Sequence, residues 1–316
     1  MESETRAPPT PPSLPTSPLV PLVLPIILAA VVNLIVPSMI GPHSPGEIFI
    51  LIVAGVIVGQ FGLIATWAVL GPWRLYAQWF VALLVGLGLF LAFMGGIALV
   101  EPPRSFRQEF SPIFLQIILG MMAFLVAAQA PLWCIRLLRG WRLVLRGTDT
   151  AQTAIESRQL QVRDILIVMT ILAVYLGSAS AVSKGHSILS DSDFMIAILI
   201  YSVIGAIWSA MVLPICLWAC FGASTIGVRV VVLMAYAFAL VVIFVGLVVV
   251  SSGGRPSPVE PFFFFAVLHA ALLATLFSGL GLARACGYQM VSIRTARRQA
   301  LPAAGSPFGP KEETPG

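Results

Sequence analysis

The segment VVVLMAYAFALVVIFVGLVVV, residues 230–250, decides the fold class, because it contains no charged side chain along its whole length. A bilayer core about 30 Å thick requires roughly 20 consecutive apolar residues in a helix. Unpaired backbone groups are costly in lipid, and the alternating pattern of barrel-type strands is absent from the sequence, so a helix is the expected conformation. The segment therefore predicts a transmembrane helix.

The composition of the whole chain leads to the same prediction. Of its 316 residues, 59% are hydrophobic and only 10% are charged, and the mean hydropathy is +0.98. Soluble domains carry about 25% charged residues, so this chain has too few polar side chains to cover a surface that faces water. The sequence predicts an all-α, polytopic integral membrane protein. Eight segments are long and apolar enough to cross the bilayer: 19–40, 48–70, 77–99, 113–135, 165–183, 194–218, 230–250 and 262–283.

The first 18 residues have a different character. Eight prolines fall within the first 25 positions, which is typical of a disordered, partly polyproline segment, and three prolines and Asn33 interrupt the first apolar segment. A cleaved signal peptide needs a basic start, whereas the only basic residue here, Arg6, is outnumbered by Glu2 and Glu4. We expect an uncleaved, Pro-rich tail over 1–18.

The distribution of basic residues predicts the orientation. In an eight-helix arrangement, 14 of the 18 Lys and Arg residues lie on one side of the membrane and 4 on the other. Because positive residues accumulate on the cytoplasmic side, both termini are expected to be cytoplasmic. The net charge of +5 comes from residues at the ends of apolar segments, where they can meet anionic lipid headgroups. We therefore expect the bilayer and its anionic headgroups as partners and no nucleic acid; the sequence identifies no protein partner.

Two short echoes indicate an internal duplication. WAVLG (67–71) recurs as WACFG (218–222), and GWRLV (140–144) is echoed by GYQMV (287–291), at offsets of 151 and 147. An even number of helices in each unit makes the copies parallel. Chance similarity between apolar sequences is the alternative. The predicted organisation is the tail 1–18, a four-helix unit 19–135, a basic cytoplasmic loop 136–164, a second four-helix unit 165–283, and a basic, disordered cytoplasmic tail 284–316.

A likeness to a protein family rests on two stretches. GQFGLIATWAVLGPWRLYAQW (59–79) and the region from RGWRLV (139–144) to RQLQVRDILIVMTILAVYLG (158–177) resemble uncharacterised multi-pass membrane proteins of planctomycetes. A segment similar to Q-F-S-L-R-D-L-L precedes an apolar helix in that family, and here QLQVRDIL (159–166) carries Arg163, Asp164, Ile165 and Leu166 in the matching places. The resemblance covers about a third of the chain. It implies the inner membrane of a bacterium and no particular activity.

The same stretch raises the question of whether Arg163 and Asp164 form a functional pair. Asp164 directly precedes the segment 165–183, where a carboxylate can cap the free N–H groups of the first helical turn. Arg163 belongs to the basic cluster expected beside anionic headgroups. We interpret the pair as the start of a helix rather than as an active site.

Few polar side chains remain inside the apolar segments. They include His269, Asn33, Gln60, Gln116 and Gln129, together with Tyr175, Tyr201 and Tyr236. None of the acidic or basic residues lies at a membrane midplane, which argues against a proton-coupled pump. His269 could contact a proton or a ligand, or it could be a neutral imidazole bonded to a neighbouring helix. Small residues at 55, 59 and 62, and at 205 and 209, are spaced as in close helix crossings.

Two further sets of residues could bind a metal. The outer side holds His43, Glu47, His186, Asp191 and Asp193, which are ligand types without a ligand spacing; a solvated loop with Asp193 as a helix cap is the alternative. The four cysteines, 134, 216, 220 and 286, are expected near the reducing cytoplasmic face, and Cys216 and Cys220 are interpreted as small buried side chains. The sequence therefore predicts no catalytic residue, no metal site and no cofactor.

Two functions remain open at this stage. The first is a non-catalytic membrane component, such as a scaffold, sensor or partner subunit. The alternative is a transporter or lipid-handling protein with a polar cavity between the two four-helix units. If His269, Gln60, Gln116, Gln129 and Tyr201 surround one cavity, the alternative gains; if they occupy separate helix contacts, the first function gains.

Overall fold

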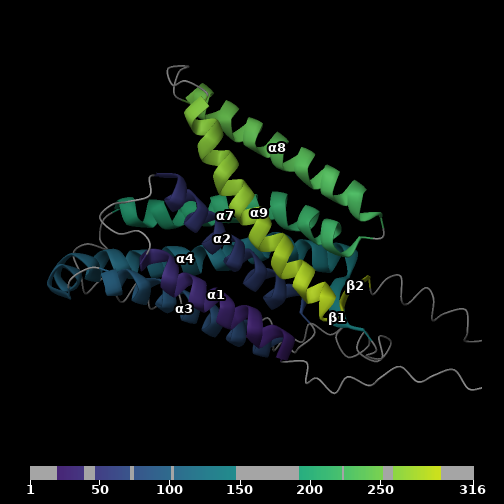
Figure 1. Ribbon diagram of the computed structural model, residues 1–316, viewed down its shortest axis with the longest axis horizontal. Helices are drawn as coiled ribbons and strands as arrows, with labels where there is room; N and C mark the ends of the chain where they lie inside the picture. The colour runs from purple at the N-terminus through teal and green to yellow at the C-terminus, as the bar shows by residue number, and fades with distance from the viewer. Residues whose placement is uncertain are drawn as a thin grey trace, which may run out of the picture.

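The fold described here is that of a computed structural model. It describes residues 20–38, 47–71, 75–100, 103–146, 192–222, 224–251 and 259–292. Within these ranges the chain is almost entirely helical (Figure 1). The helices are α1 (Val20–Ser38), α2 (Glu47–Leu70), α3 (Leu75–Val100), α4 (Pro103–Arg139), α7 (Ser192–Phe221), α8 (Ile226–Ser251) and α9 (Val259–Ala285).

Six of these helices are long and apolar enough to cross a membrane: α2, α3, α4, α7, α8 and α9. Their positions agree with six of the eight segments expected from the sequence. Helix α1 coincides with the segment 19–40, but its apolar stretch, Ile26–Ile35, is shorter than the other six. The segment 165–183 lies outside the described residues, as do the tail 1–18 and residues 147–191.

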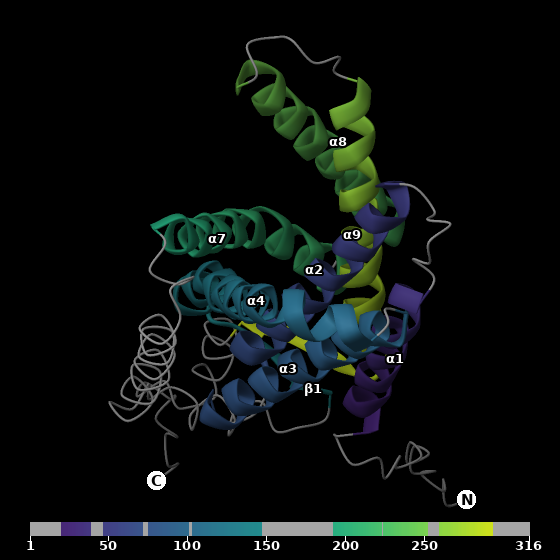
Figure 2. The same cartoon turned by 90° about the vertical axis from the view of Figure 1, so that its left-hand side faces the viewer.

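The helices pack around α2. Its most extensive contact is with α9. A slightly more extensive contact joins α4 to α7, and α1 packs along α3. The buried core is built almost only from aliphatic, aromatic and small side chains of these helices, with Leu70, Leu125, Leu213 and Leu276 among the most deeply buried. By contrast, α8 and the beginning of α9 extend away from the other helices (Figure 1 and Figure 2). Large apolar side chains are exposed along α8, as on a helix whose surroundings are lipid.

The small residues singled out from the sequence do lie at close helix crossings, which confirms that prediction. A Cβ atom at Gly55 would stand 2.5 Å from the carbonyl oxygen of Leu268 in α9, and one at Gly59 would stand 2.7 Å from Thr275. On the other contact, a Cβ atom at Gly205 would stand 2.6 Å from the ring of Phe124 in α4. These glycines therefore allow the backbones of α2 and α9, and of α7 and α4, to approach closely.

A two-stranded antiparallel ribbon closes one end of the helices. Strand β1 (Trp141–Leu145) follows α4, and strand β2 (Tyr288–Ser292) follows α9. The register pairs Trp141 with Ser292, Leu143 with Met290 and Leu145 with Tyr288. The C-termini of α2, α4, α7 and α9 lie at this end, which we call the ribbon end, and Figure 1 shows the ribbon beside the end of α9.

The ribbon corrects three expectations. The fold is not purely α-helical, the region 136–164 begins with the last turn of α4 and a strand, and the region 284–316 is ordered as helix and strand up to Ser292. A glycine with positive φ makes each change from helix to strand: Gly140 has φ of 67° and Gly287 has φ of 91°. Glycine adopts this left-handed conformation without the steric penalty that a Cβ atom brings.

Candidate functional site

His269 joins two helices through its ring. Its Nε2 accepts a hydrogen bond from the indole Nε1 of Trp208 in α7 at 3.1 Å, and its Nδ1 lies 2.8 Å from the carbonyl oxygen of Phe265, one turn earlier in α9. An indole N–H can only donate, so Nε2 carries no proton and Nδ1–H donates to the carbonyl. The imidazole is 2% exposed, and the ring of Phe244 in α8 packs 5.5 Å from it, centroid to centroid. This is the neutral, helix-bonded alternative considered for His269.

A second polar contact joins α1, α2 and α3. The side-chain amides of Asn33 and Gln60 exchange two hydrogen bonds of 2.9 and 3.0 Å, and the Asn33 amide also donates to the carbonyl oxygen of Leu89 at 3.2 Å. Both amides are buried. Hydrogen bonds of this kind between transmembrane helices contribute about 0.6–2 kcal/mol, so the pair holds α1 in place.

The remaining polar candidates occupy other places. The hydroxyl of Tyr236 in α8 donates to the carbonyl oxygen of Met211 in α7 at 2.8 Å. Gln129 is buried in α4. The side chains of Gln116, Tyr175 and Tyr201 lie outside the described residues. Each described candidate for which a partner is identified thus ties a different pair or trio of helices.

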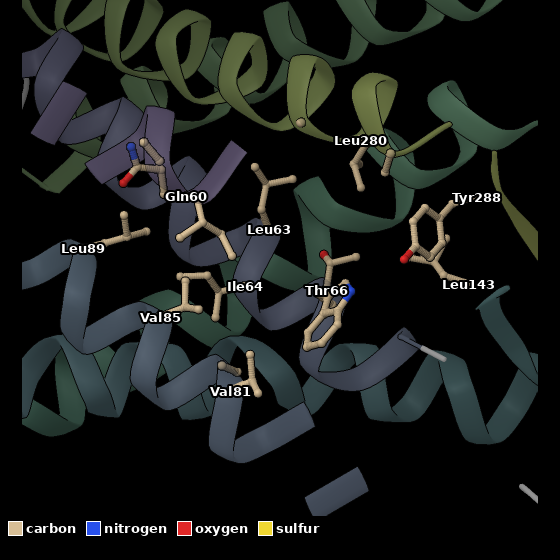
Figure 3. A pocket seen from close by; sticks show the side chains of 16 residues that line it. Gln60, Leu63, Ile64, Thr66, Val81, Val85, Leu89, Leu143, Leu280 and Tyr288 are labelled. Carbon is tan, nitrogen blue, oxygen red and sulfur yellow. The ribbon is translucent and has the colours of Figure 1, made fainter. Parts of the chain in front are cut away.

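One cavity lies between these helices and the ribbon (Figure 3). Its volume is about 160 Å³, and its lining comes from α1, α2, α3, α9, β1 and β2. Of the polar candidates whose side chains the structure describes, only Gln60 lines it; Asn33, His269, Gln129 and Tyr236 do not. Besides Gln60, Thr66 and the indole of Trp67, the lining includes the phenol of Tyr288, whose pKa is raised by burial, so that the phenol is neutral at physiological pH.

Two arginines at the ribbon end make matching contacts that were not anticipated from the sequence. The guanidinium of Arg136 in α4 donates to the carbonyl oxygen of Val69 at the end of α2, and that of Arg284 in α9 donates to the carbonyl oxygen of Cys220 at the end of α7. The last carbonyls of a helix have no partner within it and carry partial negative charge. Arg136 therefore stabilises the C-terminus of α2, and Arg284 stabilises that of α7.

A third arginine, Arg229, adds to the contact at α7. It is buried in the first turn of α8, and its Nη1 donates to the carbonyl oxygens of Ala219 at 3.0 Å and Cys220 at 3.2 Å. The sequence signal for these contacts is weak. A positive residue near the end of an apolar segment is equally typical of a side chain that faces headgroups, and only the packed helices show which carbonyls lie within reach.

The burial of Cys216 and Cys220 agrees with the interpretation of their sequence context. Cys216 and Cys220 are buried in α7 among apolar side chains, Cys134 is exposed, and Cys286 is half-buried. All four are free thiols. Within the described ranges, no group of three or more His, Cys, Asp and Glu side chains is placed to hold a metal ion.

Two sets of candidates cannot be placed. The side chains of the outer set His43, Glu47, His186, Asp191 and Asp193 lie outside the described residues, as do Arg163 and Asp164.

No family model, curated protein or solved structure matches this chain.

Proposed function

We propose that this protein is a non-catalytic integral membrane component, a scaffold, sensor or partner subunit, which presents the basic ribbon end to anionic lipid headgroups. The observation that carries the proposal is the separation of the buried polar side chains in the part of the chain that the structure describes. The Asn33–Gln60 pair, the Trp208–His269 pair and Tyr236 hold different helices together. A transporter of polar solutes needs such groups around one shared path, so the polar-cavity alternative loses its main support.

The proposed architecture is eight transmembrane helices in two tandem units of four. The ribbon supports it, because Leu143 pairs with Met290 and these two residues are also related by the offset of 147 that relates Gly140 to Gly287. Exchange of the two units would thus map the ribbon onto itself. The two most extensive helix contacts, α2 with α9 and α4 with α7, show the same symmetry. If α2 corresponds to α7 and α4 to α9, exchange of the two units turns each of these contacts into the other.

The ends of α2 and α7 supply independent support for the duplication. The N–H of Gly71 donates to the carbonyl oxygen of Trp67 at 2.9 Å, and the N–H of Gly222 donates to that of Trp218 at 2.8 Å. The pentapeptides WAVLG and WACFG therefore end α2 and α7 with the same hydrogen bond. The carbonyls that Arg136 and Arg284 reach, those of Val69 and Cys220, are also 151 positions apart. These matched polar contacts support the duplication over chance similarity between apolar segments.

The proposed location is the inner membrane of a bacterium, with the ribbon end and both termini on the cytoplasmic side. Six arginines belong to the described part of this end: 136, 139, 142, 146, 229 and 284. Among the described side chains the only carboxylate is that of Glu260. It stands at the start of α9, at the end of that helix opposite to the ribbon end. Juxtamembrane Lys and Arg gain about 1 kcal/mol each near an anionic surface, so this end favours anionic headgroups.

The test compares the protein in nanodiscs of phosphatidylcholine with and without phosphatidylglycerol. We expect phosphatidylglycerol to raise the thermal unfolding temperature at low salt and the increase to shrink at high salt, because salt screens exposed charges. Replacing the exposed Arg139 and Arg146 by Gln should remove most of the increase. Glu260→Gln, at the opposite end, is the matched control and should leave the increase unchanged. An equal unfolding temperature in both lipids would contradict the proposal.

A further inference from the structure

The cavity near the ribbon end is long and apolar. It is lined by Ile26 and Ala29 of α1, by residues 60, 63, 64, 66 and 67 of α2, by residues 81, 82, 85 and 89 of α3, by residues 279, 280 and 283 of α9, and by Leu143 and Tyr288 of the ribbon. Figure 3 shows Gln60 and Leu89 toward one end and Leu143 with Tyr288 at the other. At 1.5 Å per helical residue, the lining from Gln60 to Trp67 extends over about 10 Å along α2.

The size and chemistry of the cavity favour an aliphatic guest. An engineered cavity of about 150 Å³ lined by apolar side chains stays dry and binds benzene, and this one measures about 160 Å³. Among the described residues that line it, none carries a charge. The helices around it are spans or lie against spans, so its guest comes from the hydrocarbon phase. Helices α1 and α9 both line the cavity and make little contact with each other.

Thr66 is one of the polar residues that line the cavity. The side chain of Thr66 is 1% exposed, and its hydroxyl has no hydrogen-bond partner among the described residues. A helical threonine normally donates to a carbonyl one turn earlier, as Thr275 does to Ala271 at 2.9 Å. A buried hydroxyl without a partner costs free energy, so the position of Thr66 indicates a guest that carries a hydrogen-bond acceptor.

The depth of Thr66 in the bilayer indicates which kind of acceptor the guest carries. Thr66 lies four residues before the end of α2, or about 6 Å along the helix from the ribbon end. The hydrocarbon core of a bilayer ends within a few ångströms of such a level, since a helix of 24 residues is about 36 Å long and the core about 30 Å thick. This is the level at which acyl chains of membrane lipids join their ester carbonyls.

We propose that the cavity binds one acyl chain of a membrane phospholipid, with the ester carbonyl accepting a hydrogen bond from Thr66 and the chain running toward Gln60 and Leu89. The inference goes beyond the proposed function, because it assigns a specific lipid site inside the bundle and not a charged surface. It requires neither the tandem duplication nor the cytoplasmic orientation of the ribbon end.

The experiment uses the full chain in nanodiscs with a phosphatidylcholine that bears a diazirine on one acyl chain. After illumination, mass spectrometry locates the labelled residues. We expect adducts on Val85 and Leu280 inside the cavity, in addition to those on outward side chains such as Leu84, which every lipid can reach. Ala82→Leu and Ala283→Leu each fill part of the cavity and should abolish the inner adducts. Leu84→Phe, on the outward face of α3, is the matched control and should leave them intact.

Thr66→Val tests the polar contact without changing the shape of the side chain. A neutral hydrogen bond is worth about 0.5–1.5 kcal/mol, so the variant should weaken competition by methyl decanoate about two- to tenfold and leave competition by decane unchanged. Decanoic acid serves as the arm for a free fatty acid: if it displaces the label better than the ester does, a free acid is the guest and the phospholipid proposal fails. The proposal would also be overturned if inner adducts persisted in both filled variants. The same holds if methyl decanoate competed equally well with the label in Thr66→Val and in the parent protein.

Discussion

The indole N–H of Trp208 donates to Nε2 of His269 at 3.1 Å, and the two rings meet edge to face with their centroids 5.4 Å apart. The contact fixes the neutral tautomer of the imidazole and joins α7 to α9. Replacing His269 by Phe keeps a ring at this position but removes the acceptor. We expect the free energy of unfolding in nanodiscs to fall by about 1–3 kcal/mol, because the indole N–H of the half-buried Trp208 is left without a partner.

The control for this prediction is a double-mutant cycle. Trp208→Phe removes the donor and some packing volume, so its own effect is not a measure of the hydrogen bond. The variant that carries both replacements should lose less stability than the two single variants together, since no polar group is then left unpaired. Effects that add to within about 0.5 kcal/mol would show that the two rings are not coupled.

The second prediction concerns the change from helix to strand at Gly140 and Gly287. Both have positive φ, where a Cβ atom costs about 1–2 kcal/mol. We expect Gly140→Ala and Gly287→Ala each to lower the free energy of unfolding by this amount. The steric surroundings do not explain such a loss at Gly287, because the nearest atom to its Cβ position is a Leu145 methyl group 3.8 Å away.

Gly88 is the matched control for that pair. It lies within α3, it is exposed, and no described atom stands within 4 Å of its Cβ position. Gly88→Ala should leave stability unchanged or raise it by up to about 1 kcal/mol, because alanine has the higher helix propensity. If Gly140→Ala and Gly287→Ala behave like Gly88→Ala, the two glycines do not adopt the left-handed conformation.

The third prediction concerns the crossing of α2 and α9. A Cβ atom at Gly55 would stand 2.5 Å from a backbone oxygen, that of Leu268, so Gly55→Ala has to push the two helices apart. Overpacking of this kind costs about 1–3 kcal/mol, and we expect a corresponding loss of thermal stability. Gly281→Ala, in α9 with no described atom within 4 Å of its Cβ position, should be tolerated. Equal effects of the two replacements would contradict the close crossing.

The spans could be predicted from the sequence because length and apolarity decide them locally. The close crossing at Gly55 was also predictable, since small residues one turn apart leave a recognisable spacing. The ribbon was not, because the strands WRLVL and YQMVS are five residues long and their paired residues lie 143 to 151 positions apart in the sequence. Their pairing exists only when the ends of α4 and α9 have been brought together by the helices.

The cavity and the arginine contacts were beyond sequence reasoning for a related reason. Thr66 looks like an ordinary helical threonine, and its lack of a partner depends on what α3, α9 and Tyr288 leave open around it. Likewise, Arg136 and Arg284 resemble residues that face headgroups until the carbonyls of Val69 and Cys220 are within reach. Both features are products of packing between distant segments.

The last prediction concerns α8 and follows from the proposed duplication. In the first unit α1 lies along α3, and the Cβ position of Gly95 in α3 is 3.5 Å from the side chain of Leu34 in α1. The offset of 151 relates Gly95 to Gly246 in α8, where no described atom stands within 4 Å. The counterpart of α1 in the second unit is the segment 165–183, so the duplication predicts that this segment lies along the exposed face of α8 at Gly246.

Disulfide mapping checks this prediction in a chain whose four native cysteines are replaced by alanine. Gly246→Cys is combined in turn with a cysteine at each position from 165 to 183, and the membranes are treated with a mild oxidant. Because a disulfide needs Cα atoms about 4.4–6.8 Å apart, cross-linking should rise and fall every three to four residues over the part of the segment nearest Gly246. Gly88→Cys in α3, combined with the same cysteines at 165–183, is the control. No described atom stands within 4 Å of the Cβ position of Gly88, and this cysteine should form no intramolecular disulfide. The same low yield from both positions would mean that lipid or another chain, and not 165–183, covers this face of α8, and the two halves would then not share one four-helix plan.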